Sequence, residues 1–205
     1  MRIEELKPSQ RVKGRWLAVM EDGSILRVSE GEVADFALYS GKELTEDEAA
    51  RLVEATRRTG LKQKAIDLLT RKPQSRRELE RKLAEWGAGE EETESICARM
   101  EDLGFINDVS YAEQVVRHYT AKGYGVHKVR DELYRRGVPK ELWEDAISLA
   151  ESPEAAIDAF VQKKLAGRVP ERQDLKKLSD ALMRRGFGWE DIRSAFARLG
   201  ADTDE

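Results

Sequence analysis

The chain has 205 residues, of which 40% are hydrophobic and 37% are charged, and its formal net charge is −4 at pH 7. This balance supplies enough apolar surface to fold but favours thin helical modules over one thick core. The negative net charge argues against a uniformly basic nucleic-acid-binding protein. The one cysteine, Cys97, excludes an internal disulfide and a cysteine-based zinc site, and we expect it to be buried. With no signal-peptide pattern and no run of about 18 apolar residues, we expect a soluble, cytoplasmic protein without a membrane span.

The N-terminal region is expected to hold a small β-hairpin. Residues 1–14 are polar, and we expect them to be extended or loosely ordered. Asp22 and Gly23 lie between two short apolar-rich runs, and Asp-Gly in that setting is typical of a tight hairpin turn. The apolar residues of segment 33–38 fit a third strand or an irregular cover. Because an isolated hairpin is only marginally stable, this region should pack on another element.

Two helices are expected between this region and the middle of the chain. Thr45 and Glu48 have the spacing of a capping box, which predicts a helix start. We expect that helix to end at Gly60, and the helical pattern to resume at Lys64 and stop before Pro73.

The central segment, residues 75–87, has the sequence signals of a helix start, a helix and a helix end. Ser75 and Glu78 again have capping-box spacing. Leu79 and Leu83 then fall on one face, and Gly87 suits the left-handed position that ends a helix.

An internal repeat follows from that helix end. A leucine stands four residues before a glycine three times, at Leu83 and Gly87, Leu133 and Gly137, and Leu182 and Gly186. A fixed period of about 50 residues is typical of stacked modules. We therefore predict a mainly α fold of three tandem three-helix repeats in an elongated, curved array, with a small N-terminal β-hairpin region. The expected boundaries are 1–58 for the hairpin region plus a helix, and 59–108, 109–151 and 152–205 for the repeats.

Charge follows the same period. The net charge is +6 over residues 57–87 and −6 over 88–108, +3 over 110–136 and −5 over 137–158, and +5 over 160–185 and −3 over 186–205. One interpretation is solvated faces with ion pairs between neighbouring helices, each contributing roughly 0–1 kcal/mol. The other is a partner that is itself periodic and alternately charged, such as a protein filament that carries DNA.

The candidate partner-binding residues are cations of the first two helices of the repeats, which are basic. They are Arg71, Arg76, Arg77, Arg81 and Lys82 in the first repeat, Lys128, Arg130, Arg135 and Arg136 in the second, and Arg184 and Arg185 in the third. A basic stripe of this kind is able to follow phosphates. The alternative role for each residue is solubility.

The helical spacing of the aromatic residues indicates that they belong to the core. Tyr111, Tyr119 and Tyr124 have rings that stack on nucleobases in some proteins, but tyrosine at this spacing is more often core. Trp143 and Trp189 open third helices, and we expect both to be core anchors.

No catalytic arrangement is evident. His118 and His127 are too isolated to indicate zinc, and the glutamates of segment 90–94 suit a helix N-terminus electrostatically. There is no glycine-rich phosphate loop, G-x-S-x-G motif or Cys/His pairing. We expect a protein that is not an enzyme and has no cofactor or metal.

Each repeat carries its own sequence motif. The first-repeat motif comprises Leu68-Leu69, Arg71, Ser75-Arg76, Glu78-Leu79 and Lys82-Leu83, then Leu103 to Asp108 and Tyr111-Ala112. The second comprises Gly123-Tyr124-Gly125, Lys128-Val129-Arg130, Leu133 and Gly137-Val138, and the third comprises Leu182 to Phe187 with Ile192. Together these motifs resemble the RecX family of regulatory proteins over roughly residues 61–200.

The resemblance implies an all-helical regulator that binds the RecA recombinase, lies in the groove of its nucleoprotein filament, and limits filament growth and activity. Contact with single-stranded or double-stranded DNA through the basic helices is a further expectation, and nothing demands more than a monomer. A stand-alone helical DNA-binding module is the alternative. Inhibition and context-dependent assistance of the filament both remain open.

Overall fold

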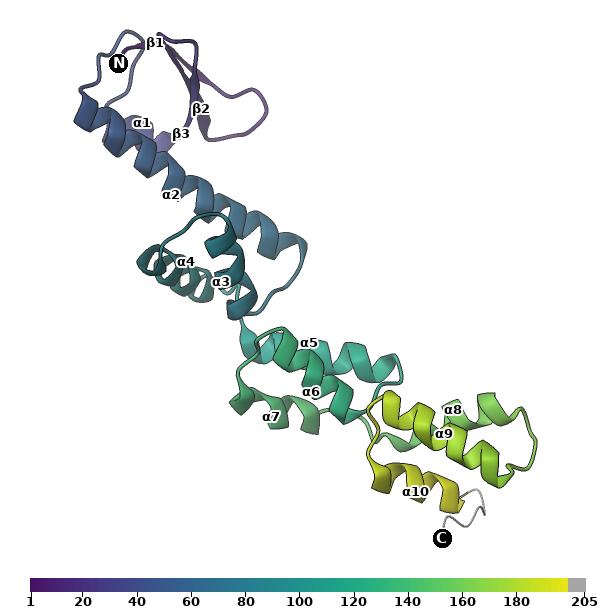
Figure 1. The fold of residues 1–205 in the computed structure, drawn as a ribbon. Coiled ribbons are helices and arrows are strands. Elements are labelled where there is room, and N and C mark those ends of the chain that lie inside the picture. The colour runs from purple at the N-terminus through teal and green to yellow at the C-terminus, as the bar shows by residue number, and fades with distance from the viewer. Residues whose placement is uncertain (199–205) are drawn as a thin grey trace. The chain divides into compact units, whose positions relative to one another are not determined.

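The computed structural model describes residues 1–198 and is mainly helical, with a small antiparallel sheet at the N-terminus (Figure 1). This confirms the expected fold class. The chain divides into two compact units, which are Met1–Lys72 with Lys82–Arg99, and Pro73–Arg81 with the chain from Met100 onward. Residues 199–205, at the end of the expected third repeat, lie outside the described residues.

The sheet has the order β1-β2-β3, with strands Ile3–Pro8, Arg15–Met20 and Ile25–Ser29. The predicted hairpin is confirmed between β2 and β3, where Gly23 has a φ of +79°. Of the two alternatives expected for residues 1–14, the extended one is confirmed for β1, which pairs with β2. The physical reason is burial, since Ile3 is fully enclosed in the core beneath the sheet.

The segment after β3 begins as a helix and not as a third strand. The expected irregular cover is confirmed for Phe36 and Leu38, which follow that helix and pack on the core. Helix α1 spans Glu30–Asp35, and Ser29 and Glu32 form its capping box. The Glu32 N–H donates to the Ser29 hydroxyl, and the Ser29 N–H donates to the Glu32 carboxylate. This S-x-x-E spacing is the signal in the sequence that predicts the helix.

Helix α2 spans Glu46–Arg71 without a break, so the prediction that a helix ends at Gly60 is wrong. The predicted capping box at its start, formed by Thr45 and Glu48, is confirmed. Glycine inside a helix costs only about 1 kcal/mol relative to alanine. The buried leucines and alanines of α2 on both sides of Gly60 offset that cost.

The remaining helices follow in the order expected for the repeats. Their bounds are α3 Arg76–Glu85, α4 Glu90–Asp102, α5 Asp108–Ala121, α6 Val126–Arg135, a 3-10 turn Lys140–Leu142, α7 Trp143–Ser148, α8 Glu154–Leu165, α9 Arg172–Arg184 and α10 Trp189–Arg198. Helices α5, α6 and α7 enclose one apolar core, and α8, α9 and α10 enclose another. Cys97 is fully buried in α4, as predicted. No helix among residues 1–198 is long and apolar enough to cross a membrane.

The second helix of every repeat ends in the same way. The three repeat leucines are fully buried, and the three glycines have φ values of +85°, +68° and +86°. The residue after each glycine donates its N–H to the repeat leucine carbonyl, at 3.0 Å, 3.0 Å and 3.2 Å. This is the hydrogen-bond pattern of a Schellman motif. The sequence period therefore corresponds to one repeated helix end.

Candidate partner-binding surface

The second unit contains two contacts between successive repeats, which we call the first and second joints. In the first joint, the buried N-cap residue Ser75 donates its hydroxyl to the Arg136 carbonyl oxygen at 2.5 Å. A Cβ atom built at Gly137 would lie 2.5 Å from the Cγ of Arg77. The start of α3 therefore lies directly against the end of α6, at a distance that only glycine permits.

The second joint joins the start of α6 to the end of α9. The Gly125 N–H donates to the Arg185 carbonyl at 2.9 Å, and the His127 N–H donates to the Gly186 carbonyl at 3.0 Å. A Cβ atom at Gly186 would lie 2.3 Å from the backbone nitrogen of Lys128, and one at Gly125 would lie 2.2 Å from the Gly186 oxygen. The same relation between neighbouring second helices thus occurs twice.

Arg136 stabilises the first joint through its guanidinium group. It donates to the Tyr111 hydroxyl at 2.7 Å, and that hydroxyl donates to the Glu78 carboxylate at 2.7 Å. Arg136 and Glu78 also form an ion pair at 3.9 Å, and both side chains are less than one-fifth exposed. Burial of Tyr111 and its hydrogen bond to Glu78 raise the pKa of this tyrosine to about 12. The tyrosine therefore stays neutral and bridges the two charged groups.

Arg185 has the equivalent position in the second joint. Its guanidinium donates to the Gly123 carbonyl at 3.2 Å and lies 4.7 Å from the centre of the Phe160 ring. It also lies 5.8 Å from the Tyr124 ring. Arg136 and Arg185 were both predicted as partner contacts from the sequence, and the structure places their guanidinium groups at the joints.

Most of the other candidate cations form ion pairs on the protein surface. The pairs are Arg76 with Glu80 and Glu101, Arg77 with Glu80, Lys82 with Glu85, Lys128 with Glu132, Arg130 with Glu144, and Arg135 with Glu132. Burial of the Glu132 carboxylate acts to raise its pKa, but hydrogen bonds and nearby positive charges, first among them the Arg135 hydrogen bond, outweigh burial and hold the pKa below its ordinary value. Apart from Arg76, the cations of these pairs are more than one-third exposed, so each pair contributes little to stability.

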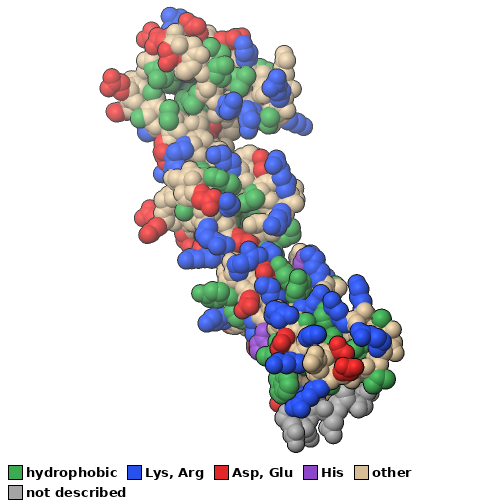
Figure 2. Space-filling model, turned by 45° about the vertical axis from the view of Figure 1, so that its right-hand side comes forward, with side chains coloured by type: hydrophobic (Ala, Val, Ile, Leu, Met, Phe, Trp, Pro, Cys, Tyr) green, Lys and Arg blue, Asp and Glu red, His purple; other side chains and the backbone are tan. Residues whose placement is uncertain are grey.

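Besides Arg185, three candidates form no ion pair with any residue of the described chain. Arg71, Arg81 and Arg184 are all exposed. Figure 2 shows Lys and Arg side chains spread over the visible face of the second unit, with Asp and Glu side chains between them. This surface therefore carries both signs of charge.

The aromatic residues divide between core and surface. Tyr111 is buried, and Tyr119 packs against the core of α5, α6 and α7. Tyr124 is partly buried beside the Tyr119 ring. Trp143 is partly buried and donates its indole N–H to the Val138 carbonyl at 3.0 Å. Trp189 is 51% exposed, so the prediction that it anchors a core is wrong.

Two exposed apolar residues occupy equivalent positions that the sequence analysis did not single out. Tyr134 is 71% exposed and directly follows the buried Leu133, and Met183 is 54% exposed and directly follows the buried Leu182. Each directly follows the repeat leucine, and this shared position is the signal in the sequence that separates them from other exposed apolar residues.

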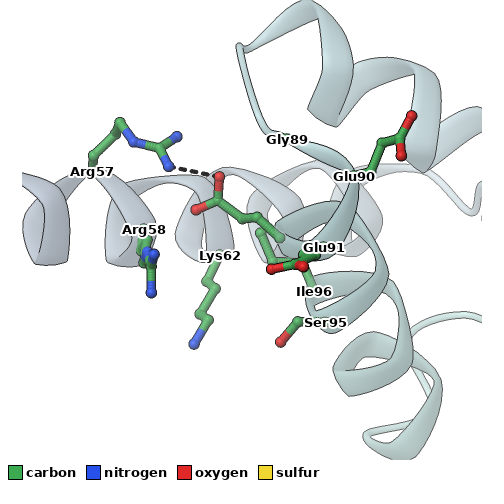
Figure 3. A pocket seen from close by; sticks show the side chains of 9 residues that line it. Arg57, Arg58, Lys62, Gly89, Glu90, Glu91, Ser95 and Ile96 are labelled. Atoms are coloured by element: carbon green, nitrogen blue, oxygen red, sulfur yellow. Dashed lines mark hydrogen bonds and ion pairs between the residues drawn. The ribbon is translucent and has the colours of Figure 1, made fainter.

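A hollow in the first unit gathers charges of both signs between α2 and the start of α4 (Figure 3). Its volume is about 640 Å³, and Arg57, Arg58 and Lys62 face the glutamates at the start of α4 across it. The Arg57 guanidinium forms an ion pair with Glu92 at 2.7 Å. Within residues 1–198, no group of three or more His, Cys, Asp or Glu side chains is arranged to hold a metal ion.

Successive three-helix modules that share the same helix end, and that meet twice at equivalent positions, define a tandem helical-repeat protein. Family models of RecX match the chain in three consecutive pieces, which are the first three-helix domain over residues 62–100, the second over 107–147 and the third over 153–196. The chain belongs to the RecX family.

Relatives and solved structures agree with this assignment. The chain is 31% identical over 137 residues to the regulatory protein RecX of Prosthecochloris aestuarii, covering 66% of this chain and 91% of the relative. It is 36% identical over 138 residues to the regulatory protein RecX of Stenotrophomonas maltophilia, covering 65% and 83%. A crystal structure of a regulatory protein RecX shares the fold with a TM-score of 0.71 at 22% identity, covering 96% of this chain and 98% of that one. The chain is thus a member of a family of regulatory proteins.

Proposed function

We propose that this protein binds the RecA recombinase and its DNA filament as a monomer, and thereby modulates filament growth, ATP hydrolysis and recombination. Family membership supports the choice of partner. The observation that carries the proposal in this chain is the repeated joint, which presents exposed arginines at equivalent positions, Arg135 and Arg184. A surface with a fixed repeat suits a partner built from identical subunits.

The mechanism needs no covalent chemistry. Exposed ion pairs such as Arg77 with Glu80 and Arg130 with Glu144 contribute little to folding, so their cations can exchange an internal carboxylate for one on a partner at small cost. The unpaired cations Arg81 and Arg184 extend this surface within the second unit. Contacts of this kind, made on successive subunits, alter filament assembly by occupying the surfaces that assembly uses.

A stand-alone DNA-binding module is the second candidate. It is favoured by the exposed cations of the second helices, because cations near phosphates release counterions and produce binding that weakens steeply with salt. It is disfavoured by the net charge of −4 and by the glutamates beside most of these cations. The two functions differ in whether binding requires the recombinase.

The experiment that tests the proposal is a titration of RecA's single-stranded-DNA-dependent ATP hydrolysis with this protein. We expect inhibition well below one protein per RecA subunit. A variant carrying Arg77→Ala, Arg81→Ala and Arg184→Ala should inhibit less. The matched control replaces Arg117, Arg168 and Arg193, which are exposed arginines of the same unit outside the proposed surface, and it should behave as the wild type.

One outcome of this titration would contradict the proposal. If hydrolysis is unchanged at all ratios while the protein still retards bare DNA in a gel, the protein is a DNA-binding module and the recombinase is not its partner.

A further inference from the structure

Each joint brings together a large apolar side chain and cations from two repeats. At the first joint, Tyr134 and Arg135 lie in the last turn of α6, and the glycine that ends that turn lies against Arg77 of α3. We call Arg77, Tyr134 and Arg135 the first joint patch. All three side chains are more than half exposed.

The second joint repeats this composition. Met183 and Arg184 lie in the last turn of α9, and the glycine after that turn lies against Lys128 of α6. We call Lys128, Met183 and Arg184 the second joint patch. Met183 is 54% exposed and Lys128 is 38% exposed. The two patches therefore share an apolar centre, an arginine beside it in sequence, and a cation from the preceding repeat.

Core packing does not account for either apolar residue. Both follow a fully buried leucine, so the helix directs them away from the core that the leucine fills. Single exposed apolar residues are common on protein surfaces. Here the position after the repeat leucine is exposed and apolar in two consecutive repeats. In both repeats it lies beside cations. Tyr, Met and Arg are also the residue types enriched at the centres of protein–protein interfaces.

The composition distinguishes a protein partner from a nucleic acid. Base stacking requires a flat ring, and Tyr134 has one, but Met183 at the equivalent position does not. The carboxylate of Glu132, which pairs with Lys128 and Arg135, would also repel a phosphate near either patch. An apolar pocket bordered by carboxylates satisfies both patches equally well. The same pocket must occur twice on the partner, because the patches are equivalent and belong to successive joints.

We propose that the two joint patches bind two identical pockets, each apolar with an acidic rim, on two subunits of the recombinase filament. This inference rests on the proposed function and specifies the partner contacts. Binding through two linked contacts is stronger than through either one, because the second contact forms within the complex.

The test measures the affinity of the full-length protein for the recombinase filament on single-stranded DNA, with bare single-stranded DNA as a second ligand. Tyr134→Ala and Met183→Ala should each weaken filament binding by about five- to thirtyfold, as truncation of an interface centre does. The affinity of the double variant for the filament should fall by about the product of the two single-variant factors, since the patches contact separate subunits. Affinity for bare DNA should not change.

The matched controls are Leu149→Ala and Val169→Ala. These residues are 68% and 89% exposed in the same unit but lie outside both patches, so these variants should bind as the wild type does. Thermal unfolding of all four variants should match the wild type, because the side chains removed are on the surface.

Three results would overturn the inference. If the wild type binds the filament and all four variants bind equally well, the patches are not contacts and the proposed function stands without them. If Tyr134→Ala weakens binding to bare DNA as much as binding to the filament, the first patch contacts nucleic acid. If the wild type does not bind the filament, the proposed function fails and the inference fails with it.

Discussion

At the two joints, the missing side chain of a glycine decides how closely successive repeats approach. Gly137 and Gly186 serve two purposes, because each allows the positive φ that ends a helix and leaves room for the neighbouring repeat. Gly125 differs, since its φ of −85° is accessible to any residue. Only the space at the joint requires glycine at position 125.

Gly125→Ala isolates that requirement. The added Cβ would lie 2.2 Å from the Gly186 carbonyl oxygen, and without backbone strain at its own position the cost comes from overpacking alone. We expect a loss of about 1–3 kcal/mol in the free energy of unfolding. Urea denaturation followed by circular dichroism measures it. Gly89→Ala, where the new methyl group meets nothing within 4 Å, is the control, and an equal loss in both variants would contradict the steric explanation.

Tyr111 should give the first joint a dependence on alkaline pH. Its pKa in the folded protein is about 12, above the ordinary tyrosine value of 10.0, because burial and the Glu78 carboxylate disfavour the phenolate. A raised folded pKa contributes stability that is complete below the unfolded pKa and is lost as the pH rises through the folded one. The contribution of this hydroxyl should therefore persist to about pH 10 and disappear between pH 10 and 12.

Tyr111→Phe tests this directly. Loss of the hydroxyl leaves Glu78 and Arg136 without their bridge, and we expect destabilisation of about 1–3 kcal/mol at neutral pH. The difference in unfolding free energy between the wild type and the variant should shrink above pH 10. A difference that stays constant up to pH 12 would show that ionisation of Tyr111 does not control the joint.

At the scale of the elements, the sequence predicted helix starts better than it predicted helix ends. The capping boxes at Thr45 and Ser75 were predicted and are confirmed. The predicted helix end at Gly60 is wrong, because the buried residues on both sides of this single glycine outweigh its low helix propensity. Ser29 and Glu32 carried the same capping signal and were overlooked because the surrounding apolar residues also fit a strand.

Gly60→Ala should stabilise α2. A Cβ at this helical position meets nothing within 4 Å, so the substitution adds helix propensity without a clash. We expect a gain of about 0.5–1 kcal/mol, visible as an increase in the midpoint of thermal unfolding. A decrease in the midpoint would mean that the glycine is needed for a bend or a contact at this position.

At the scale of the whole molecule, the alternation of charge is explained in part by internal ion pairs. Arg57 pairs with Glu92, Arg130 with Glu144, and Arg198 with Asp158, each joining two helices of one unit. These pairs agree with the interpretation of solvated faces. They leave the unpaired cations as the residues able to bind a partner without breaking an internal contact.

The salt dependence of binding should separate DNA contact from recombinase contact. The net charge of −4 and the interspersed glutamates should keep affinity for bare single-stranded DNA low. Fluorescence anisotropy at about 50 and 200 mM salt should show weak binding to bare DNA that is lost at the higher salt, and filament binding that persists. Tight, salt-sensitive binding to bare DNA would favour the DNA-binding module instead.

The sequence by itself determined the helical repeat, because a buried leucine and a left-handed glycine are local requirements that recur with a fixed period. It also identified the basic second helices. Only the tertiary structure decided which cations face outward. Arg135 and Arg136 are neighbours in the sequence, yet one is exposed and the other is enclosed with Tyr111 and Glu78. The joints themselves were also invisible in the sequence, because they depend on contacts between residues about 60 positions apart, which no local pattern specifies.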